Sequence, residues 1–267
     1  LALRCRVADR WRGSVPKSVS RRPWFSVDRT GWPTITALIS LLALVSLGAP
    51  AKSHAGNPLV VFPERPERLR ALRYHAEDSE QCLAELALRE VPFARGPKVP
   101  TIDTPVRSTG PLRGVVFEMH HPSARHPREG PVMDCRLLLA LDDLSVVAAD
   151  RGVARVRFNS IHRGRWVQRR GWRHAAGVAI DIVEIVMKDG EALNVLRDFD
   201  GHGIGSRTCG AAAPTPHKAK ARALREFVCA IDALGSFNLI LTPHYDRRHK
   251  DHLHLEVRRS IDWFLTQ

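Results

Sequence analysis

The sequence predicts an α+β fold in which a small, mostly antiparallel sheet has about three helices packed on one side. Two segments with helical spacing of apolar residues come early in the chain, and β-branched segments with a hairpin signal follow them. A third helical segment lies between the later strands. Helices followed by mostly antiparallel strands, rather than strict alternation, are typical of the α+β class. The 267 residues are 44% hydrophobic, enough for a sizeable core.

The first two predicted helices carry their own start signals. Residues 79–90 place Cys82, Leu83 and Leu86 on one face, and Asp78 or Ser79 can cap that helix. Residues 135–149 repeat apolar residues at helical spacing after Asp134, a second capping residue. The segment before the first of these helices is rich in Pro and Arg and is expected to be extended.

The third helix is expected to start with Thr215 as N-cap and Pro216 at its first position, and to end at Gly235. Lys188-Asp189-Gly190 is a hairpin turn signal between two of the predicted strands. Strands are expected at 114–119, 153–161, 177–187, 192–196, 237–241 and 252–258.

An uncharged stretch from Ile35 to Leu47 indicates an export signal. Its thirteen residues are too few to span a bilayer, which takes about 20, but they fit the apolar part of a signal peptide. Ser53-His54-Ala55 supplies a small-residue cleavage site. The alternative is a buried core helix. The signal predicts a secreted or periplasmic protein without a stable membrane span after cleavage.

The domain organisation follows from these signals. We expect an N-terminal extension with a signal peptide at 1–55, an N-terminal helix with a Pro-rich loop at 56–130, a core domain at 131–259 and a C-terminal tail at 260–267.

The charge is uneven along the chain. Residues 1–55 carry a net charge of +7, so the other 212 residues carry only +6 of the total of +13. That excess favours anionic surfaces such as cell-wall polymers. Nucleic acid is not an expected partner, because the arginines are dispersed and no basic helix is interleaved with aromatic residues. The oligomeric state is not predicted.

Four of the five cysteines lie after the predicted cleavage site, and export permits disulfides. Four cysteines allow three pairings. We favour Cys82–Cys135 with Cys209–Cys229, and buried free thiols are the alternative. No pair has the C-x-x-C spacing of a cysteine zinc site.

Three histidines within six residues, His249, His252 and His254, give a strong local signal for metal chemistry. His252 and His254 lie two apart in a predicted strand, so both side chains leave the same face. Two adjacent imidazoles pack poorly in a core, because each needs a hydrogen-bonding partner. A solvated, His-rich turn is the alternative interpretation.

A carboxylate and a fourth histidine point to the same chemistry. Asp181 lies between Ile180 and Ile182 in an apolar strand, where an unpaired carboxylate would cost several kcal/mol. His174 precedes it by seven residues, and Gly177 allows the chain to turn between them. Two imidazoles and one carboxylate make a three-ligand zinc set with an open fourth position, as in catalytic zinc sites.

Two sequence blocks carry a resemblance to a known family. HAAGVAIDIVEIVMKDG from His174 and LTPHYDRRHKDHLHLE from Leu241, with the helical segments CLAEL and CRLLLALDDL, resemble the extensin-like C-terminal domain family. The likeness runs from about Glu80 to Glu256. The spacing H-x-x-G-x-A-x-D followed by H-x-H is similar to that of the lysostaphin, D-Ala-D-Ala metallopeptidase and Hedgehog fold group.

The resemblance implies a secreted zinc metallopeptidase that hydrolyses peptide bonds of peptidoglycan stem peptides or cross-links, as an endopeptidase or carboxypeptidase. It implies that His174, Asp181 and His254 bind zinc. It further implies that His252 acts as base or transition-state stabiliser and that His249 is an additional active-site histidine. Arg169 falls where the family carries an arginine that anchors the substrate.

The chain also departs from the family. Trp172 replaces a serine two residues before the first histidine, Gln168 replaces a cysteine, and 198–214 looks like an insertion. The Trp172 replacement favours one alternative, a zinc-containing but non-hydrolytic wall-binding or structural protein. Two further alternatives are an inert domain with a metal-free His/Asp hydrogen-bond cluster and a nucleic-acid binder driven by basic charge.

Overall fold

The computed structural model describes residues 57–121, 130–163, 173–201, 203–258 and 261–267. The chain divides into two units, Leu1–Ala51 and Lys52–Gln267, and all described residues belong to the second. The predicted signal peptide, Gln168, Arg169 and Trp172 lie outside the described residues.

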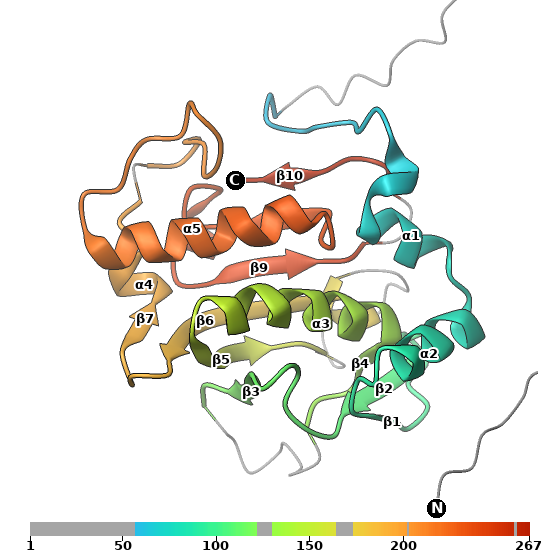
Figure 1. Ribbon diagram of the computed structural model, residues 1–267. Coiled ribbons are helices and arrows are strands. Elements are labelled where there is room, and N and C mark those ends of the chain that lie inside the picture. Colours follow the sequence, from blue (N-terminus) through green and yellow to red (C-terminus); the bar gives the residue numbers. More distant parts are fainter. Residues whose placement is uncertain (1–56, 122–129, 164–172, 202, 259–260) are drawn as a thin grey trace, which may run out of the picture. The chain divides into compact units, whose positions relative to one another are not determined.

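The described part of the chain combines helices with two sheets (Figure 1), which confirms the predicted α+β class. Its α-helices are α1 (Arg70–Ala76), α2 (Ser79–Leu88), α3 (Cys135–Asp150), α4 (Val195–Asp198) and α5 (Ala219–Leu234). Short 3-10 turns are η1 (Pro66–Arg68), η2 (Arg173–Ala176) and η3 (Arg247–His249). Among these residues, no helix is both long and apolar enough to cross a membrane.

The larger sheet has seven strands and is mixed. Its order is β10-β8-β9-β6-β5-β3, with β7 paired to β6. The pairs β3–β5 and β8–β10 are parallel and the others antiparallel. The strands are β3 (Val116–Met119), β5 (Val153–Ser160), β6 (Ala179–Met187), β7 (Ala192–Asn194), β8 (Leu239–Leu241), β9 (Leu253–Glu256) and β10 (Leu265–Thr266).

A smaller antiparallel sheet joins β1 (Phe93–Arg95), β2 (Pro105–Ser108) and β4 (Met133–Asp134) in the order β1-β2-β4. It leads directly into α3, because Asp134 ends β4 and accepts a hydrogen bond from the backbone N–H of Arg136 at 3.1 Å. Asp134 is thus the N-cap that the sequence predicts.

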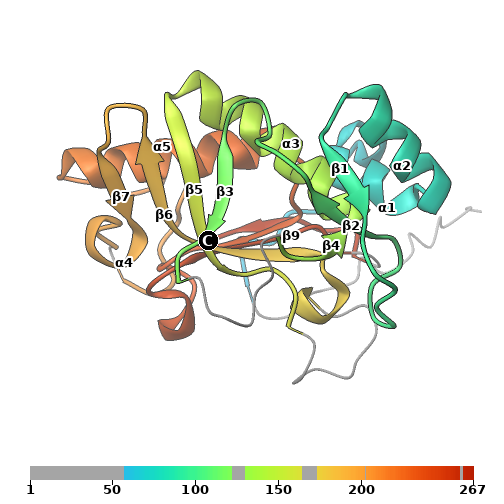
Figure 2. The same cartoon turned by 90° about the horizontal axis from the view of Figure 1, so that it is seen from below.

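The helices α3 and α5 lie on one face of the larger sheet (Figures 1 and 2). The apolar faces of α3 and α5 share one core with alternate side chains of β6 and β9. These strand residues include Ile180, Ile182, Leu253 and Leu255. Side chains in a strand point alternately to opposite faces. The residues between these core positions therefore face away from the helices, and these include Asp181 and His254.

Three local expectations from the sequence differ from the structure. Residues 70–76 form α1 rather than an extended segment, because Ala71 and Tyr74 are buried, with Tyr74 in the core shared with α3. The third helix starts at Ala219 instead of Pro216, and Lys218 occupies the N-cap without a side-chain hydrogen bond. Leu265–Thr266, in the predicted tail, adds strand β10 to the sheet.

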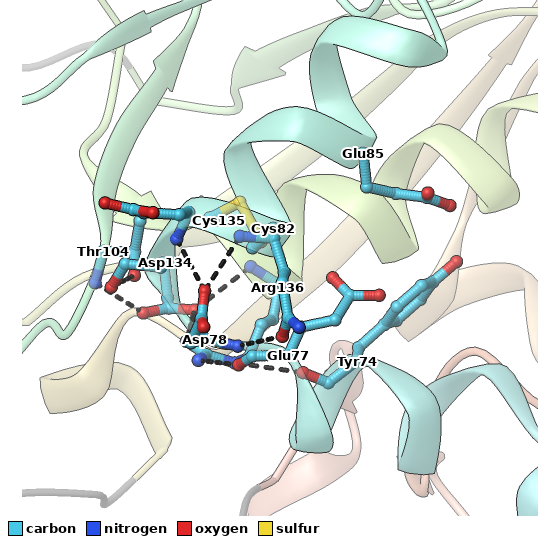
Figure 3. Close-up of a disulfide and its surroundings, with 12 residues drawn as sticks. Tyr74, Glu77, Asp78, Cys82, Glu85, Thr104, Asp134, Cys135 and Arg136 are labelled. Atoms are coloured by element: carbon cyan, nitrogen blue, oxygen red, sulfur yellow. Dashed lines mark hydrogen bonds and ion pairs between the residues drawn. A yellow bond between two sulfur atoms is a disulfide. The ribbon is translucent and has the colours of Figure 1, made fainter.

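Both favoured disulfides are present: Cys82–Cys135 joins α2 to α3, and Cys209–Cys229 joins the loop before α5 to α5 itself. Figure 3 shows the first of them beside Arg136, which is 2% exposed. The Arg136 guanidinium pairs with Asp134 at 3.0 Å and donates to the backbone carbonyls of Tyr74 and Glu77. The N-terminal helices are therefore linked to α3 by a disulfide and by the hydrogen bonds of the buried Arg136 guanidinium.

Candidate metal centre

Asp181 and His254 lie opposite each other on adjacent antiparallel strands, β6 and β9. Both side chains leave the sheet on the face away from the helices. His254 Nδ1 is 2.9 Å from Asp181 Oδ1, and the two residues are 3% and 2% exposed. The strand register thus brings together two of the predicted ligands that are 73 residues apart in sequence.

His174 reaches the same carboxylate from the turn η2, immediately before β6. Its Nε2 lies 3.2 Å from Asp181 Oδ1, and the residue is 8% exposed. Gly177 makes this approach feasible, since it has a φ of +66° and a Cβ there would lie 2.8 Å from the backbone nitrogen of Asp134. The same Asp134 N–H donates to the carbonyl of Gly177 at 2.9 Å. Only glycine adopts this turn without strain.

His174, Asp181 and His254 each offer one ligand atom, and these atoms lie within 4.8 Å of one another. They form a buried His/Asp group that could hold a metal ion. The hydrogen bonds of the rings test the fit. His174 Nδ1 is 2.7 Å from the carbonyl oxygen of Ile161, which can only accept, so the proton sits on Nδ1 and a neutral ring has its lone pair on Nε2.

His254 lies between two carboxylates. Its Nδ1 is 2.9 Å from Asp181 Oδ1 and its Nε2 is 3.4 Å from a carboxylate oxygen of Glu256, so a neutral ring with its proton on Nε2 has its lone pair on Nδ1. Both lone pairs then point at the anionic Oδ1 of Asp181. Acceptors facing one another without a proton or cation between them repel, so neutral rings and this carboxylate fit a cation. Carbonyl and carboxylate groups that orient metal-binding histidines are the usual outer partners of such sites.

The two oxygens of Asp181 have separate partners. Oδ1 faces the histidines, whereas Oδ2 accepts hydrogen bonds from Ser160 Oγ at 2.8 Å and from the guanidinium of Arg163. Arg163 also donates to Ser160 Oγ at 2.9 Å. The carboxylate is thereby held with one oxygen turned toward the candidate metal position.

The electrostatics of the site favour an ionised carboxylate. Burial disfavours the charge of Asp181, but hydrogen bonds and attraction from His174 and His254 outweigh it and hold its pKa well below the usual range. Burial likewise disfavours protonation of His254, yet Asp181 and Glu256 outweigh it and raise the pKa of His254. The same two carboxylates that favour a proton on His254 would also favour a cation beside it.

His252 and His249 stand beside this group. His252 Nε2 is 3.5 Å from Asp181 Oδ1, and its Nδ1 donates to Asp251 Oδ1 at 2.8 Å. His249 is 8% exposed, and its Nδ1 donates to Asp246 Oδ1 at 2.7 Å. Burial lowers the pKa of His249 despite the attraction of Asp246. The ring centroids of His249 and His252 are 5.1 Å apart.

The structure thus places five of the six predicted metal-binding and active-site residues in one cluster, while the sixth, Arg169, lies outside the described residues. Sequence reasoning missed Ser160, Arg163, Glu256 and the aspartates that hold the outer histidines. Glu256 follows His254 by two positions in a strand, so period-two spacing could have found it. Arg163 gives no comparable signal.

Comparison with known proteins gives one family match. Residues 140–265 match the family model described as extensin-like protein C-terminus. The match includes all of the histidines and carboxylates of the cluster, and it supports the extensin-like family for this part of the chain. No curated protein and no solved structure matches the chain.

Proposed function

We propose that this protein is an exported, zinc-dependent hydrolase that cleaves peptide bonds in peptidoglycan stem peptides or cross-links. One observation carries the proposal: two imidazole nitrogens lie within 3.2 Å of one buried carboxylate oxygen, and a third imidazole, His252, is 3.5 Å from that oxygen. The substrate class comes from the resemblance to the lysostaphin and D-Ala-D-Ala metallopeptidase group.

The zinc would be held by Nε2 of His174, Oδ1 of Asp181 and Nδ1 of His254. When bound through three protein ligands, zinc polarises a carbonyl group and lowers the pKa of water to about 7. Ser160 and Arg163 would keep the free oxygen of Asp181 turned away, so that the carboxylate offers a single ligand atom.

His252 is the proposed general base. Its Nδ1–H donates to Asp251, so the lone pair of the neutral ring is on Nε2, the nitrogen that faces Asp181. That nitrogen would take a proton from the attacking water and pass it to the leaving amine. A positioned base of this kind contributes about 10²- to 10⁴-fold to the rate. Asp251 would act as a positioning residue for the ring.

The substrate is expected to carry a carboxylate near the bond that is cut. The Arg163 side chain is 50% exposed and pairs with Asp181, so its solvent-facing N–H groups can donate hydrogen bonds to a substrate carboxylate. The resemblance assigns the same task to Arg169.

Two variants separate the roles. His254→Ala should lose both zinc and turnover of isolated muropeptides, whereas His252→Ala should keep zinc and lose turnover by about 10²-fold or more. His217→Ala, an exposed histidine before α5, is the matched control and should change neither.

The measurements are metal content after dialysis and release of new amino termini. A fully active His254→Ala protein would overturn the zinc assignment. A wild-type protein that holds zinc without any turnover would favour the non-hydrolytic wall-binding function, which the replacement of the family serine by Trp172 also favours.

A further inference from the structure

A second set of three ligand atoms overlaps the candidate zinc centre. His249, His252 and His254, here called the His trio, offer nitrogens that lie within 4.8 Å of one another. His249 lies in the turn η3, His254 lies in the strand β9, and His252 lies directly before β9. This set contains no carboxylate ligand, in contrast to the set around Asp181.

Two members of the His trio are held in one tautomer by carboxylates. Nδ1 of His249 donates to Asp246, and Nδ1 of His252 donates to Asp251, so each neutral ring has its lone pair on Nε2. Histidines that ligate metals through one nitrogen usually donate the other to such a partner. The site is therefore built beyond the three rings alone.

Asp246 is itself fixed. Its Oδ1 accepts from the backbone N–H groups of Arg248 at 2.8 Å and His249 at 3.1 Å, which makes it the N-cap of η3. The orientation of His249 is thereby set by the start of the turn. His249 and His254 are buried, and the His252 side chain is 16% exposed, which leaves a way in from solvent.

Only one of the two sets can hold an ion at a time. His254 belongs to both, and a neutral imidazole has a single nitrogen lone pair in the ring plane, so it can bind one ion. An ion on the His trio also occupies Nε2 of His252, the proposed base.

We propose that the His trio is an alternative metal site that competes with the His174/Asp181/His254 set for one ion. Three neutral imidazoles suit Cu²⁺ and Ni²⁺ at least as well as Zn²⁺, whereas carboxylate ligands favour harder ions. The nature of the ion then decides which set is filled, and an ion on the His trio leaves the protein without a free His252. Metal binding at the His trio does not require hydrolytic activity.

The test uses Cu²⁺ alone on the full chain, with binding followed by competition against a chelator and nitrogen ligands counted by electron paramagnetic resonance. His174→Ala disables the first set and should still bind one Cu²⁺ per chain. The double variant with His249→Ala should bind Cu²⁺ at least about 10-fold more weakly. Loss of a residue that only supports a ligand already lowers metal affinity by about that factor. His217→Ala added instead should have no effect.

The proposal is overturned if His174→Ala binds no Cu²⁺, or if His174→Ala with His249→Ala binds it as tightly as His174→Ala alone. Circular dichroism checks folding, and Asp181→Asn replaces His174→Ala if the latter is unfolded. The wild-type protein and His249→Ala are compared as well, because loss of a nitrogen coupling from Cu²⁺ in the variant reports directly on the His trio. Failure of muropeptide turnover alone would leave these results unchanged.

Discussion

At the scale of the residue, the site depends on how one carboxylate is shared. Asp181 is 2% exposed, and a buried charge is tolerated only with partners that compensate for its desolvation. Its Oδ2 is satisfied by Ser160 and Arg163, which leaves Oδ1 for the imidazoles of His174 and His254. Because the two oxygens have different partners, Oδ1 of this buried carboxylate is directed at the candidate metal position.

Gly177 is the residue whose replacement tests this local geometry. Gly177→Ala should lower the free energy of unfolding by about 3 kcal/mol or more, because the new Cβ is strained at positive φ and also meets the backbone of Asp134. Gly114→Ala is the matched control: its φ is +82° but nothing lies within 4 Å, so about 1 kcal/mol is expected. Urea unfolding of both variants measures the difference, and equal losses would contradict the role given to Gly177.

The residues of the buried His/Asp group could be predicted from the sequence, but their supporting contacts could not. An aspartate between two isoleucines and a pair of histidines two positions apart can be recognised in the sequence alone. Ser160, at the end of β5, lies beside Asp181 because the pairing of β5 with β6 shifts register before it, and Arg163 follows three residues later. Such shifts have no sequence signature that a single chain displays.

At the scale of the element, side-chain contacts override the sequence signals for two helices. Thr215-Pro216 is a strong start signal, yet the Arg222 side chain donates to the carbonyls of Pro216 and His217, and the helix starts only at Ala219. The seven residues of α1 are too few for a stable isolated helix, and they are helical because they pack on α3. Capped helices such as α2, with its Asp78–Gln81 capping box, follow the sequence closely.

The two disulfides should stabilise the elements they join to different degrees. Cys82–Cys135 spans 53 residues and Cys209–Cys229 spans 20. The chain-entropy model gives about 4 kcal/mol for the first and about 3 kcal/mol for the second. Paired Cys→Ala variants compared by urea unfolding should therefore show the larger loss for Cys82 with Cys135. A larger loss for the other pair would contradict this ordering.

At the scale of the whole molecule, a buried charge network on the helical side fastens distant parts of the chain together. Asp143 on α3 accepts from Tyr74 on α1 at 2.5 Å, from Ser236 after α5 at 2.6 Å and from Arg89 after α2 at 3.0 Å. The larger hydrophobic core among the described residues has members from Tyr74 to Val257. Because the network joins residues far apart in the sequence, local patterns did not predict α1.

The network predicts a loss of stability at alkaline pH. Burial, followed by the nearby charge of Asp143, raises the pKa of Tyr74 above its ordinary value of 10.0. The contribution of the neutral phenol is therefore full below about pH 10, the unfolded value, and is lost as the pH rises toward the folded value. In Tyr245→Phe, Tyr74 is the remaining tyrosine, and its phenolate absorbance should appear only together with unfolding. Phenolate absorbance near pH 10 in the folded protein would contradict the network.

The most direct test of the account is a crystal structure of the zinc-loaded protein with anomalous differences measured on both sides of the zinc absorption edge. We expect one zinc peak bonded at about 2.0 to 2.2 Å to His174 Nε2, Asp181 Oδ1 and His254 Nδ1. The account would be contradicted if no zinc peak were found at this position, or if zinc were bonded only to other residues.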